Sequence, residues 1–364
     1  MSIDFNRERW ETVKKNARDW WAGKLGRPLI QVMLSGRSPG RPEPKLSSVS
    51  RDKTAYDLSV APEAIVDRWD YELSCLEFLG DSFPCVNPDF GPGVLAAFMG
   101  AKPEPGGGTV WFHPKREMEL EDMRFLIEPD NIWLRRITDI CRAAMARWQG
   151  MVQVGMTDLG GNLDVLSTFR PGEKLLMDLV DFPDEVKRLT WEAHAAWWKA
   201  FEEINSVLRP LNPGYTAWAP IFSETPYYML QCDFCYMIGP AMFDEFVLPE
   251  ISASCKKLNH AFYHLDGVGQ LAHLDALLAV DELKGVQWVP GAGKPQGEGW
   301  PEVYRKIIRA GKRAQFITLD DWRHFDKLAD RIGGVENFIV SVHAPEPPEN
   351  RREVENFLKR YGVI

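Results

Sequence analysis

Short apolar segments, rich in β-branched and aromatic residues, alternate with longer helical patterns along most of this 364-residue chain. Such alternation is typical of strand–helix–strand units, which assemble into parallel sheets. Eight strand-like segments in a chain of this length predict a (β/α)8 (TIM) barrel, here as one domain spanning 1–364. The expected strands are 28–34, 82–87, 151–157, 215–222, 261–266, 285–290, 314–320 and 338–343.

Two further segments complete this expected architecture. A helix is predicted over 5–24, ahead of the first strand, and the Gly- and Pro-rich interval 88–150 reads as an insertion that holds a hairpin and a helix at 129–148. A doubly wound open sheet is the alternative to the barrel. It is disfavoured because no glycine-rich phosphate turn follows the first strand at 28–34.

Charge and hydropathy exclude several classes of protein. A net charge of −9 argues against nucleic-acid binding, and no stretch approaches the roughly 20 apolar residues that span a bilayer. The first residues are charged throughout and do not resemble a signal peptide. The six cysteines lack the spacing of a disulfide framework, so Cys232 and Cys235 are expected to be structural and the protein cytoplasmic.

Candidate metal ligands occur where two expected strands end. In the stretch "YHLDG", His264 and Asp266 are two residues apart, and a strand sends such residues to the same face. His343 ends the last expected strand. Two imidazoles and a carboxylate suit zinc, or a harder ion such as iron or manganese. The alternative is that His264 and Asp266 only hydrogen-bond to each other or to substrate.

Carboxylates follow other expected strand ends. Glu224 and Asp158 are candidates for the general acid or base, with Asp266 as a further catalytic carboxylate. Asp320 is a candidate substrate contact. Asp321 is better explained as the N-cap of the helix that follows it.

Tryptophans also lie at the expected strand ends. Of the 14 tryptophans in the chain, Trp218, Trp288 and Trp322 lie within or just beyond strands, where their rings could stack on a sugar or another flat substrate. The alternative is that each ring packs between the sheet and the surrounding helices.

Four segments resemble the uroporphyrinogen decarboxylase-like superfamily in their order and spacing. They are "TDLGGNLDVLSTFRPGEKLLMDLVDFPDEVKRL", "CDFCYMIGPAMFDEFVLPEISASCKKL", "YHLDG" and "SVHAPEPPENRREVENFL". The similarity runs from about residue 130 to the end of the chain, and more faintly from residue 5. It implies a (β/α)8 barrel, and it implies a substrate contact at Asp233.

The superfamily includes metal-free uroporphyrinogen decarboxylases and zinc-dependent methyltransferases that work with corrinoid proteins or thiols. The methyltransferase ligands, a His-x-Cys turn and a later Cys, fall on His264, Asp266 and His343. Replacement of both thiolates makes the predicted site harder and more Lewis-acidic. The decarboxylase branch fits poorly, because only Arg37 and Arg41 remain where that branch has an Arg-rich substrate grip.

The leading hypothesis is therefore a metal-dependent methyltransferase or demethylase that acts on a small organic substrate, with a corrinoid protein as a partner and a homodimer as its assembly. A carbohydrate-active barrel, as a hydrolase, lyase or isomerase, is the alternative enzyme. A non-catalytic barrel that binds a small molecule is the third hypothesis.

Overall fold

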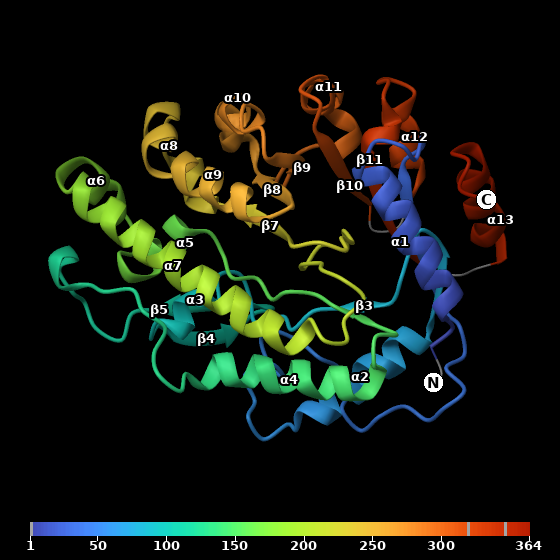
Figure 1. The fold of residues 1–364 in the computed structure, drawn as a ribbon, viewed down its shortest axis with the longest axis horizontal. Coiled ribbons are helices and arrows are strands. Elements are labelled where there is room, and N and C mark those ends of the chain that lie inside the picture. The colour runs from blue at the N-terminus through green and yellow to red at the C-terminus, as the bar shows by residue number, and fades with distance from the viewer. Residues whose placement is uncertain (1–2, 319–320, 346–347) are drawn as a thin grey trace.

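A parallel sheet forms the centre of the molecule (Figure 1). The computed structural model describes residues 3–318, 321–345 and 348–364. The strands of the main sheet are joined in the order β2-β1-β11-β10-β9-β8-β7, and all neighbours are parallel except β2, which runs antiparallel to β1. They are β1 (Leu29–Ser35), β2 (Leu76–Gly80), β7 (Tyr227–Gln231), β8 (His260–Asp266), β9 (Leu283–Val289), β10 (Arg313–Thr318) and β11 (Phe338–Pro345).

No strand of the main sheet fills the interval between its two edge strands, β2 and β7, in the described part of the chain. There β3 (Cys85–Val86) and β6 (Gln153–Val154) form a separate parallel pair, which is shorter than the strands expected at 82–87 and 151–157. Within the described part of the chain, the hydrogen-bonded ladder therefore does not close into a ring. The architecture is a mixed α/β fold with a parallel sheet, and the closed barrel that the sequence predicts is not confirmed.

The segment 215–222, predicted as a strand, is instead a loop. Its ends are joined by an isolated bridge between Tyr215 and Ser223, and Met156 N donates to Thr216 O at 2.8 Å. The strand of this region is β7, five residues further along the chain. The prediction of a strand at 215–222 is therefore wrong, although the loop is as apolar and as buried as a strand would be, with Ala217 and Ile221 fully covered.

Helices pack around the sheet. In Figure 1, α8 to α12 follow the outer side of β7 to β11, while α4 and α7 lie together beside the β4–β5 hairpin. The α-helices are α1 (Arg7–Trp21), α2 (Pro62–Ser74), α3 (Leu95–Phe98), α4 (Ile132–Trp148), α5 (Asn162–Phe169), α6 (Lys174–Asp181), α7 (Pro183–Leu208), α8 (Pro240–Phe246), α9 (Leu248–Lys257), α10 (Leu274–Leu278), α11 (Pro301–Arg309), α12 (Arg323–Ala329) and α13 (Pro348–Arg360). Short 3-10 helices are η1 (Leu120–Asp122), η2 (Asp233–Met237), η3 (Val268–His273), η4 (Gly297–Gly299) and η5 (Val335–Asn337).

The first helix and the predicted insertion form as their sequences indicate. In α1, the buried residues Trp10, Val13, Ala17 and Trp20 recur at helical spacing, which explains why this helix packs one face on the molecule. The insertion contains the hairpin of β4 (Lys102–Gly106) and β5 (Thr109–His113), followed by α4. Asn131 caps α4 by accepting hydrogen bonds from Trp133 N and Leu134 N.

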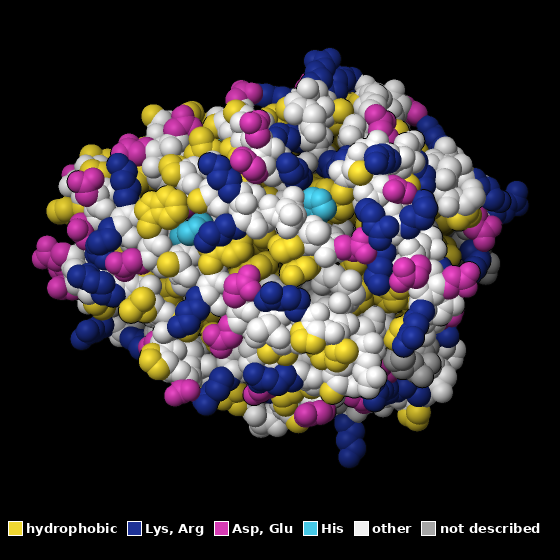
Figure 2. Space-filling view, viewed as in Figure 1, with side chains coloured by type: hydrophobic (Ala, Val, Ile, Leu, Met, Phe, Trp, Pro, Cys, Tyr) yellow, Lys and Arg dark blue, Asp and Glu magenta, His cyan; other side chains and the backbone are white. Residues whose placement is uncertain are grey.

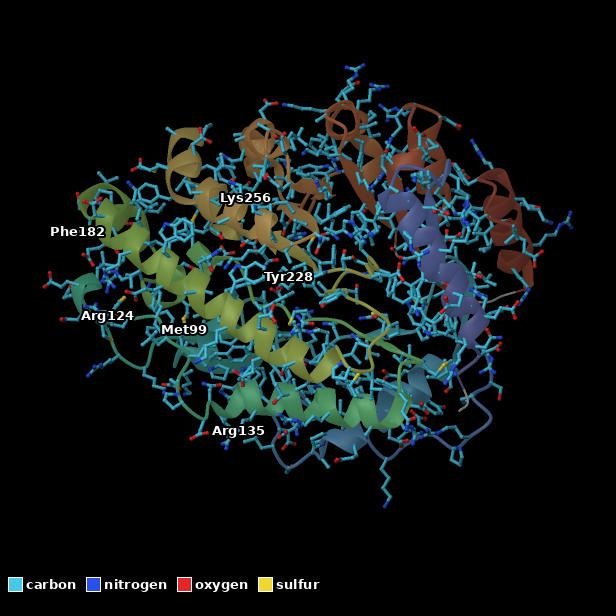
Figure 3. All side chains as sticks on the ribbon, in the orientation of Figure 1. Met99, Arg124, Arg135, Phe182, Tyr228 and Lys256 are labelled. Atoms are coloured by element: carbon cyan, nitrogen blue, oxygen red, sulfur yellow. The ribbon has the colours of Figure 1, made fainter. Side chains whose placement is uncertain are left out.

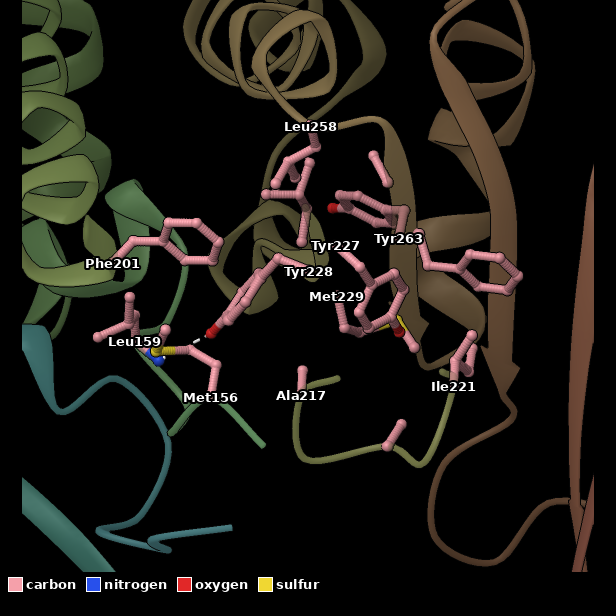
Figure 4. Close-up of a cluster of buried hydrophobic side chains, with 14 of the residues drawn as sticks. Met156, Leu159, Phe201, Ala217, Ile221, Tyr227, Tyr228, Met229, Leu258 and Tyr263 are labelled. Atoms are coloured by element: carbon pink, nitrogen blue, oxygen red, sulfur yellow. Dashed lines mark hydrogen bonds between the residues drawn. The ribbon is translucent and has the colours of Figure 1, made fainter. Parts of the chain in front are cut away.

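Aromatic side chains fill the space between the sheet and α7, as Figure 4 shows. Tyr228 of β7 lies in the interior of the molecule, whereas Arg124, Arg135 and Phe182 lie at its periphery (Figure 3). The Tyr228 ring packs edge-on against Trp197, with 4.8 Å between the ring centroids, and its hydroxyl accepts a hydrogen bond of 2.8 Å from Leu159 N. This bond connects the loop after β6 with strand β7, two segments that are not joined by strand pairing.

Gly285 of β9 lies directly over the buried ring of Phe262 in β8. A Cβ atom at this position would overlap the ring, which is fully enclosed and has no free space to move into. We expect Gly285→Ala to lower the free energy of unfolding by about 1–3 kcal/mol, as overpacking of a core does. Gly333→Ala is the matched control, because no atom lies within 4 Å of its added Cβ. Equal denaturant midpoints for the two variants would contradict this packing.

Among the described residues, no helix combines the length and the apolar character that crossing a bilayer requires. On the face of the molecule drawn in Figure 2, Lys and Arg side chains are interspersed with Asp and Glu rather than gathered in blocks of one sign.

Candidate functional site

Three potential metal ligands meet where β7 and β8 end. His264 and Asp266 belong to the end of β8, and Asp233 opens η2 directly after β7. Each of the three offers one ligand atom, and these atoms lie within 4.8 Å of one another. His264 Nε2 is 3.7 Å from Asp266 Oδ2. We call Asp233, His264 and Asp266 the acidic–histidine cluster.

A chain of glutamines orients His264. In the sheet, His264 is paired with Gln287 of β9, and Gln287 is paired with Gln315 of β10. Gln287 Nε2 donates to Gln315 Oε1 at 2.7 Å. This bond directs the other amide atom, Gln287 Oε1, toward His264 Nδ1, and these two atoms are hydrogen-bonded. Because the amide oxygen accepts, Nδ1 carries a proton, and Nε2 is the nitrogen that faces the two carboxylates. Outer partners of this kind fix the orientation of metal-binding histidines.

The charges of the cluster favour a cation. Burial lowers the pKa of His264, but the hydrogen bond to Asp266 and the negative charges of Asp233 and Asp266 outweigh it, so the net shift is upward. Burial raises the pKa of Asp233, His264 opposes this shift and Asp266 adds to it. Two carboxylates beside one imidazole therefore stabilise positive charge at this point, whether a proton or a metal ion supplies it.

Asp158 lies beside the cluster, on the loop after β6. Its Oδ1 accepts hydrogen bonds from Gly160 N at 2.8 Å and from Gln231 Nε2 at 3.2 Å. Burial is the main reason that the pKa of Asp158 rises to about 6, and the nearby Asp233 carboxylate also raises it. A carboxyl group whose pKa lies near neutrality is suited to acid–base work.

A cavity of about 410 Å³ connects these groups, and we call it the inner cavity. Its volume lies in the range that is usual for small-molecule sites. Arg51 and Asp89 lie on its wall, joined by a hydrogen bond of 2.9 Å from Arg51 Nε to Asp89 Oδ2. Its lining is Arg51, Asn87, Asp89, Gly91, Pro92, Asp158, Trp218, Gln231, Asp233, His264 and Asp266.

His343 is not part of the cluster, so the predicted grouping of His264, Asp266 and His343 is corrected: Asp233 takes the third place. Strand order explains why. His343 is on β11, three strands from β8. His264 is paired with Gln287, Gln287 with Gln315, and Gln315 with Ile339 of β11. The residue of β11 at the level of His264 is therefore Ile339, and His343 lies four residues further along this strand. At about 3.3 Å per residue, this offset alone is about 13 Å.

Glu224 lies just ahead of the start of β7, whereas the cluster lies where β7 and β8 end, so its predicted placement at a strand end is wrong. It precedes β7 instead of following a strand, because 215–222 is a loop. Arg18 of α1 holds it, with Arg18 Nε 2.9 Å from Glu224 Oε2 and Nη2 3.2 Å from Oε1. The pair links the first helix to the rim of the molecule and has no contact with the cluster.

Of the three tryptophans, Trp218 alone lines the inner cavity. Its ring meets His264 edge-on, at 4.9 Å between the centroids. Trp288 is buried and packs against Trp300. Gln287 points toward His264, and successive strand residues point to opposite faces of the sheet, so Trp288 points away from the cluster. Trp322 is also buried, at the start of α12. The proposed aromatic platform, which was the main support for a carbohydrate-active enzyme, therefore does not form.

The remaining predicted residues have structural surroundings. Asp320 lies outside the described residues. Asp321 accepts a hydrogen bond of 2.9 Å from the backbone N of Arg323, the first residue of α12, but the N-cap of this helix is Trp322, so the predicted N-cap is one residue off. Cys232 and Cys235 are buried. Arg41 is paired with Asp67 and Asp70, so it is not available to grip a substrate carboxylate.

Sequence reasoning missed the carboxylate that holds Asp233 in place. Asp164 of α5 accepts backbone hydrogen bonds from Asp233 N at 3.0 Å, Phe234 N at 2.7 Å and Gly161 N at 3.2 Å. These bonds fix the turn in which β7 passes into η2. The signal was the stretch "GGNLD", in which an acidic residue stands in the first turn of a helix whose preceding residue is a glycine.

The fold of this chain is similar to that of a solved structure. A methyltransferase from Methanosarcina mazei superposes with a TM-score of 0.61 at 14% sequence identity, and the match covers 96% of this chain and 98% of that one. At this identity the likeness concerns the fold. No family model matches the sequence, and no curated protein does.

Proposed function

We propose that this protein is a metal-dependent methyltransferase or demethylase that acts on a small organic substrate. The observation that carries the proposal is the acidic–histidine cluster, in which three ligand atoms within 4.8 Å face the inner cavity at the end of parallel strands. The similarity in fold to a methyltransferase supports the type of reaction. Membership of the uroporphyrinogen decarboxylase-like superfamily, with its barrel architecture, is part of this proposal.

The residues of the cluster fit a zinc ion. Ligand atoms around tetrahedral zinc are roughly 2.0–2.2 Å from the metal, so small side-chain rotations would bring the three groups into a shell that substrate or water completes. A bound divalent ion would act as a Lewis acid that polarises the atom bearing the methyl group. His264 would bind the ion through Nε2, because Nδ1 donates its proton to Gln287, and a bound cation would replace the proton that the two carboxylates otherwise stabilise on Nε2. Asp233 is held by its backbone bonds to Asp164.

In the proposed reaction, the methyl group would pass to an acceptor such as the cobalt of a corrinoid protein, while the donor heteroatom would keep the electron pair of the broken bond and take up a proton. The protein would work as a homodimer. The test uses protein loaded with zinc, reduced cobalamin as the acceptor, and a panel of methyl ethers, thioethers and amines as donors. Formation of methylcobalamin is followed by its absorbance. A metal-loaded protein that transfers no methyl group from any donor class would contradict the proposal.

Asp158 is the proposed general acid, which would protonate the donor heteroatom as the methyl group leaves. Its pKa of about 6 means that it carries this proton mainly below pH 6, so the rate should be highest there and should fall as the pH rises through about 6. Asp158→Asn should lower kcat about 100-fold or more and remove this limb of the pH profile, while the zinc content stays unchanged. An unaltered profile in Asp158→Asn would exclude Asp158 from proton transfer. Glu224→Gln is the control, and its profile should match that of wild type.

A further inference from the structure

A second and larger cavity lies next to the cluster. It has a volume of about 630 Å³ and is enclosed by the β4–β5 hairpin, the segment that joins α5 to α6, and η2. Figure 1 shows β5, α5 and α6 at the same end of the molecule. Most of its lining surface is apolar and comes chiefly from Val110, Trp111, Phe112, Leu176, Phe234 and Met237. We call it the outer cavity.

The outer cavity adjoins the inner one. Pro92, Gln231 and Asp233 line both. Asp233 is also one of the three residues of the acidic–histidine cluster, so a molecule lying in the outer cavity has one end at the cluster. The two cavities are therefore neighbours, with charged groups around the inner one and a largely apolar surface around the outer one.

The rim of the outer cavity exposes large apolar groups. Trp111 is 67% exposed and Met237 is 55% exposed, on opposite walls formed by β5 and η2. Exposed apolar area costs about 25 cal/mol per Å², and a ligand that covers it recovers this free energy. Several polar side chains of this cavity are already engaged: Asp164 accepts from three backbone N–H groups, and Ser167 Oγ donates to Asp164 O. His113 and Glu173 are exposed, so their charges can remain in water. The remaining lining surface favours an apolar ligand.

We propose that the outer cavity is the subsite for an uncharged, apolar part of the substrate, of the size of one or two aromatic rings. This part anchors the molecule so that its reactive end lies at Asp233, His264 and Asp266. The substrate class is then an amphiphilic molecule with a small polar head and a flat or branched apolar body. The assignment of the outer cavity as a substrate subsite rests on the proposed function. The expectation that the cavity binds an apolar molecule does not rest on it.

The test measures binding of 2-naphthalenemethanol to metal-free protein by calorimetry, comparing two neighbouring substitutions in α6. Leu176 lines the cavity, whereas Met177 is 58% exposed and is not part of its lining. We expect Leu176→Arg to weaken binding about tenfold or more, because a charged side chain then occupies apolar space, and Met177→Arg to change it less than about twofold. Thr168→Trp fills the same cavity from α5 and should also abolish binding.

The outcomes separate this proposal from the proposed function. Two results would overturn the subsite: wild-type protein does not bind the probe, or both Leu176→Arg and Thr168→Trp bind it as well as wild type does. If Leu176→Arg loses the probe but wild type neither holds zinc nor transfers methyl groups, the apolar site stands and the proposed function falls. If methyl transfer occurs, Leu176→Arg should raise KM for apolar donors more than for small ones, and Met177→Arg should not.

Discussion

His264→Ala should reduce the zinc content of the purified protein from about one ion per chain to background. The imidazole is one of only three ligand atoms in the acidic–histidine cluster, and its loss leaves two carboxylates that repel each other. Substitution of a residue that hydrogen-bonds to a metal ligand typically lowers metal affinity about 10–100-fold. We therefore expect removal of the ligand itself to lower the affinity for zinc more than about 100-fold. Elemental analysis and competition with a zinc-binding dye measure the two quantities, and methyl transfer should fall with them.

His343→Ala is the control that separates two geometries. If the cluster is His264, Asp266 and Asp233, His343→Ala keeps its zinc while Asp233→Asn loses much of it. Loss of zinc in His343→Ala, with normal content in Asp233→Asn, would instead favour the grouping that the sequence predicted. Gln287→Leu provides an intermediate case, because it leaves every ligand in place but removes the group that orients His264; we expect a loss of about 10–100-fold.

Asp81→Ala should be among the most destabilising single substitutions in the chain. The carboxylate is almost fully buried and joins three elements: it accepts from Arg27 Nη1 at 2.7 Å and Nη2 at 3.0 Å, from Ile30 N at 2.9 Å, and from Asn16 Nδ2 at 2.8 Å. Its removal leaves the half-buried Arg27 charge and the Ile30 N–H without this acceptor. The expected loss is about 3–5 kcal/mol in the free energy of unfolding.

Denaturant unfolding of Asp81→Ala should be compared with that of Asp19→Ala. Asp19 also carries a salt bridge, to Lys15 four residues earlier in α1, but this pair lies at the surface. Exposed pairs contribute little because water screens them, so the midpoint of Asp19→Ala should stay close to that of wild type. Similar losses in the two variants would mean that burial of Asp81 does not have the effect that its contacts indicate.

Local patterns predicted the parts of the site that depend on one strand. His264 and Asp266 share a face because strand residues alternate, and this required no knowledge of the neighbouring strands. The register between strands was not visible in the sequence. Once His264 is known to be level with Gln287, the outward direction of Trp288 follows, but nothing local fixed that pairing.

The errors at Glu224 and His343 have different physical causes. The segment 215–222 is apolar enough for a strand and is buried like one, so hydrophobic pattern alone could not distinguish it from a loop that fills the same space. His343 was misplaced because the position of β11 around the sheet depends on the order of all the strands. The role of Asp233 requires the turn into η2, which is held by a carboxylate 69 residues earlier in the chain.

The loop at 215–222 has a consequence for how the inner cavity can vary. His264 and Asp266 are held in the paired strand β8, and Asp233 opens η2 just after the paired strand β7, whereas Trp218 stands on a loop without strand partners on either side of it. The free-energy cost of a longer loop grows only slowly with its length. Insertions and deletions near Trp218 can therefore remodel one wall of the inner cavity while the acidic–histidine cluster keeps its position.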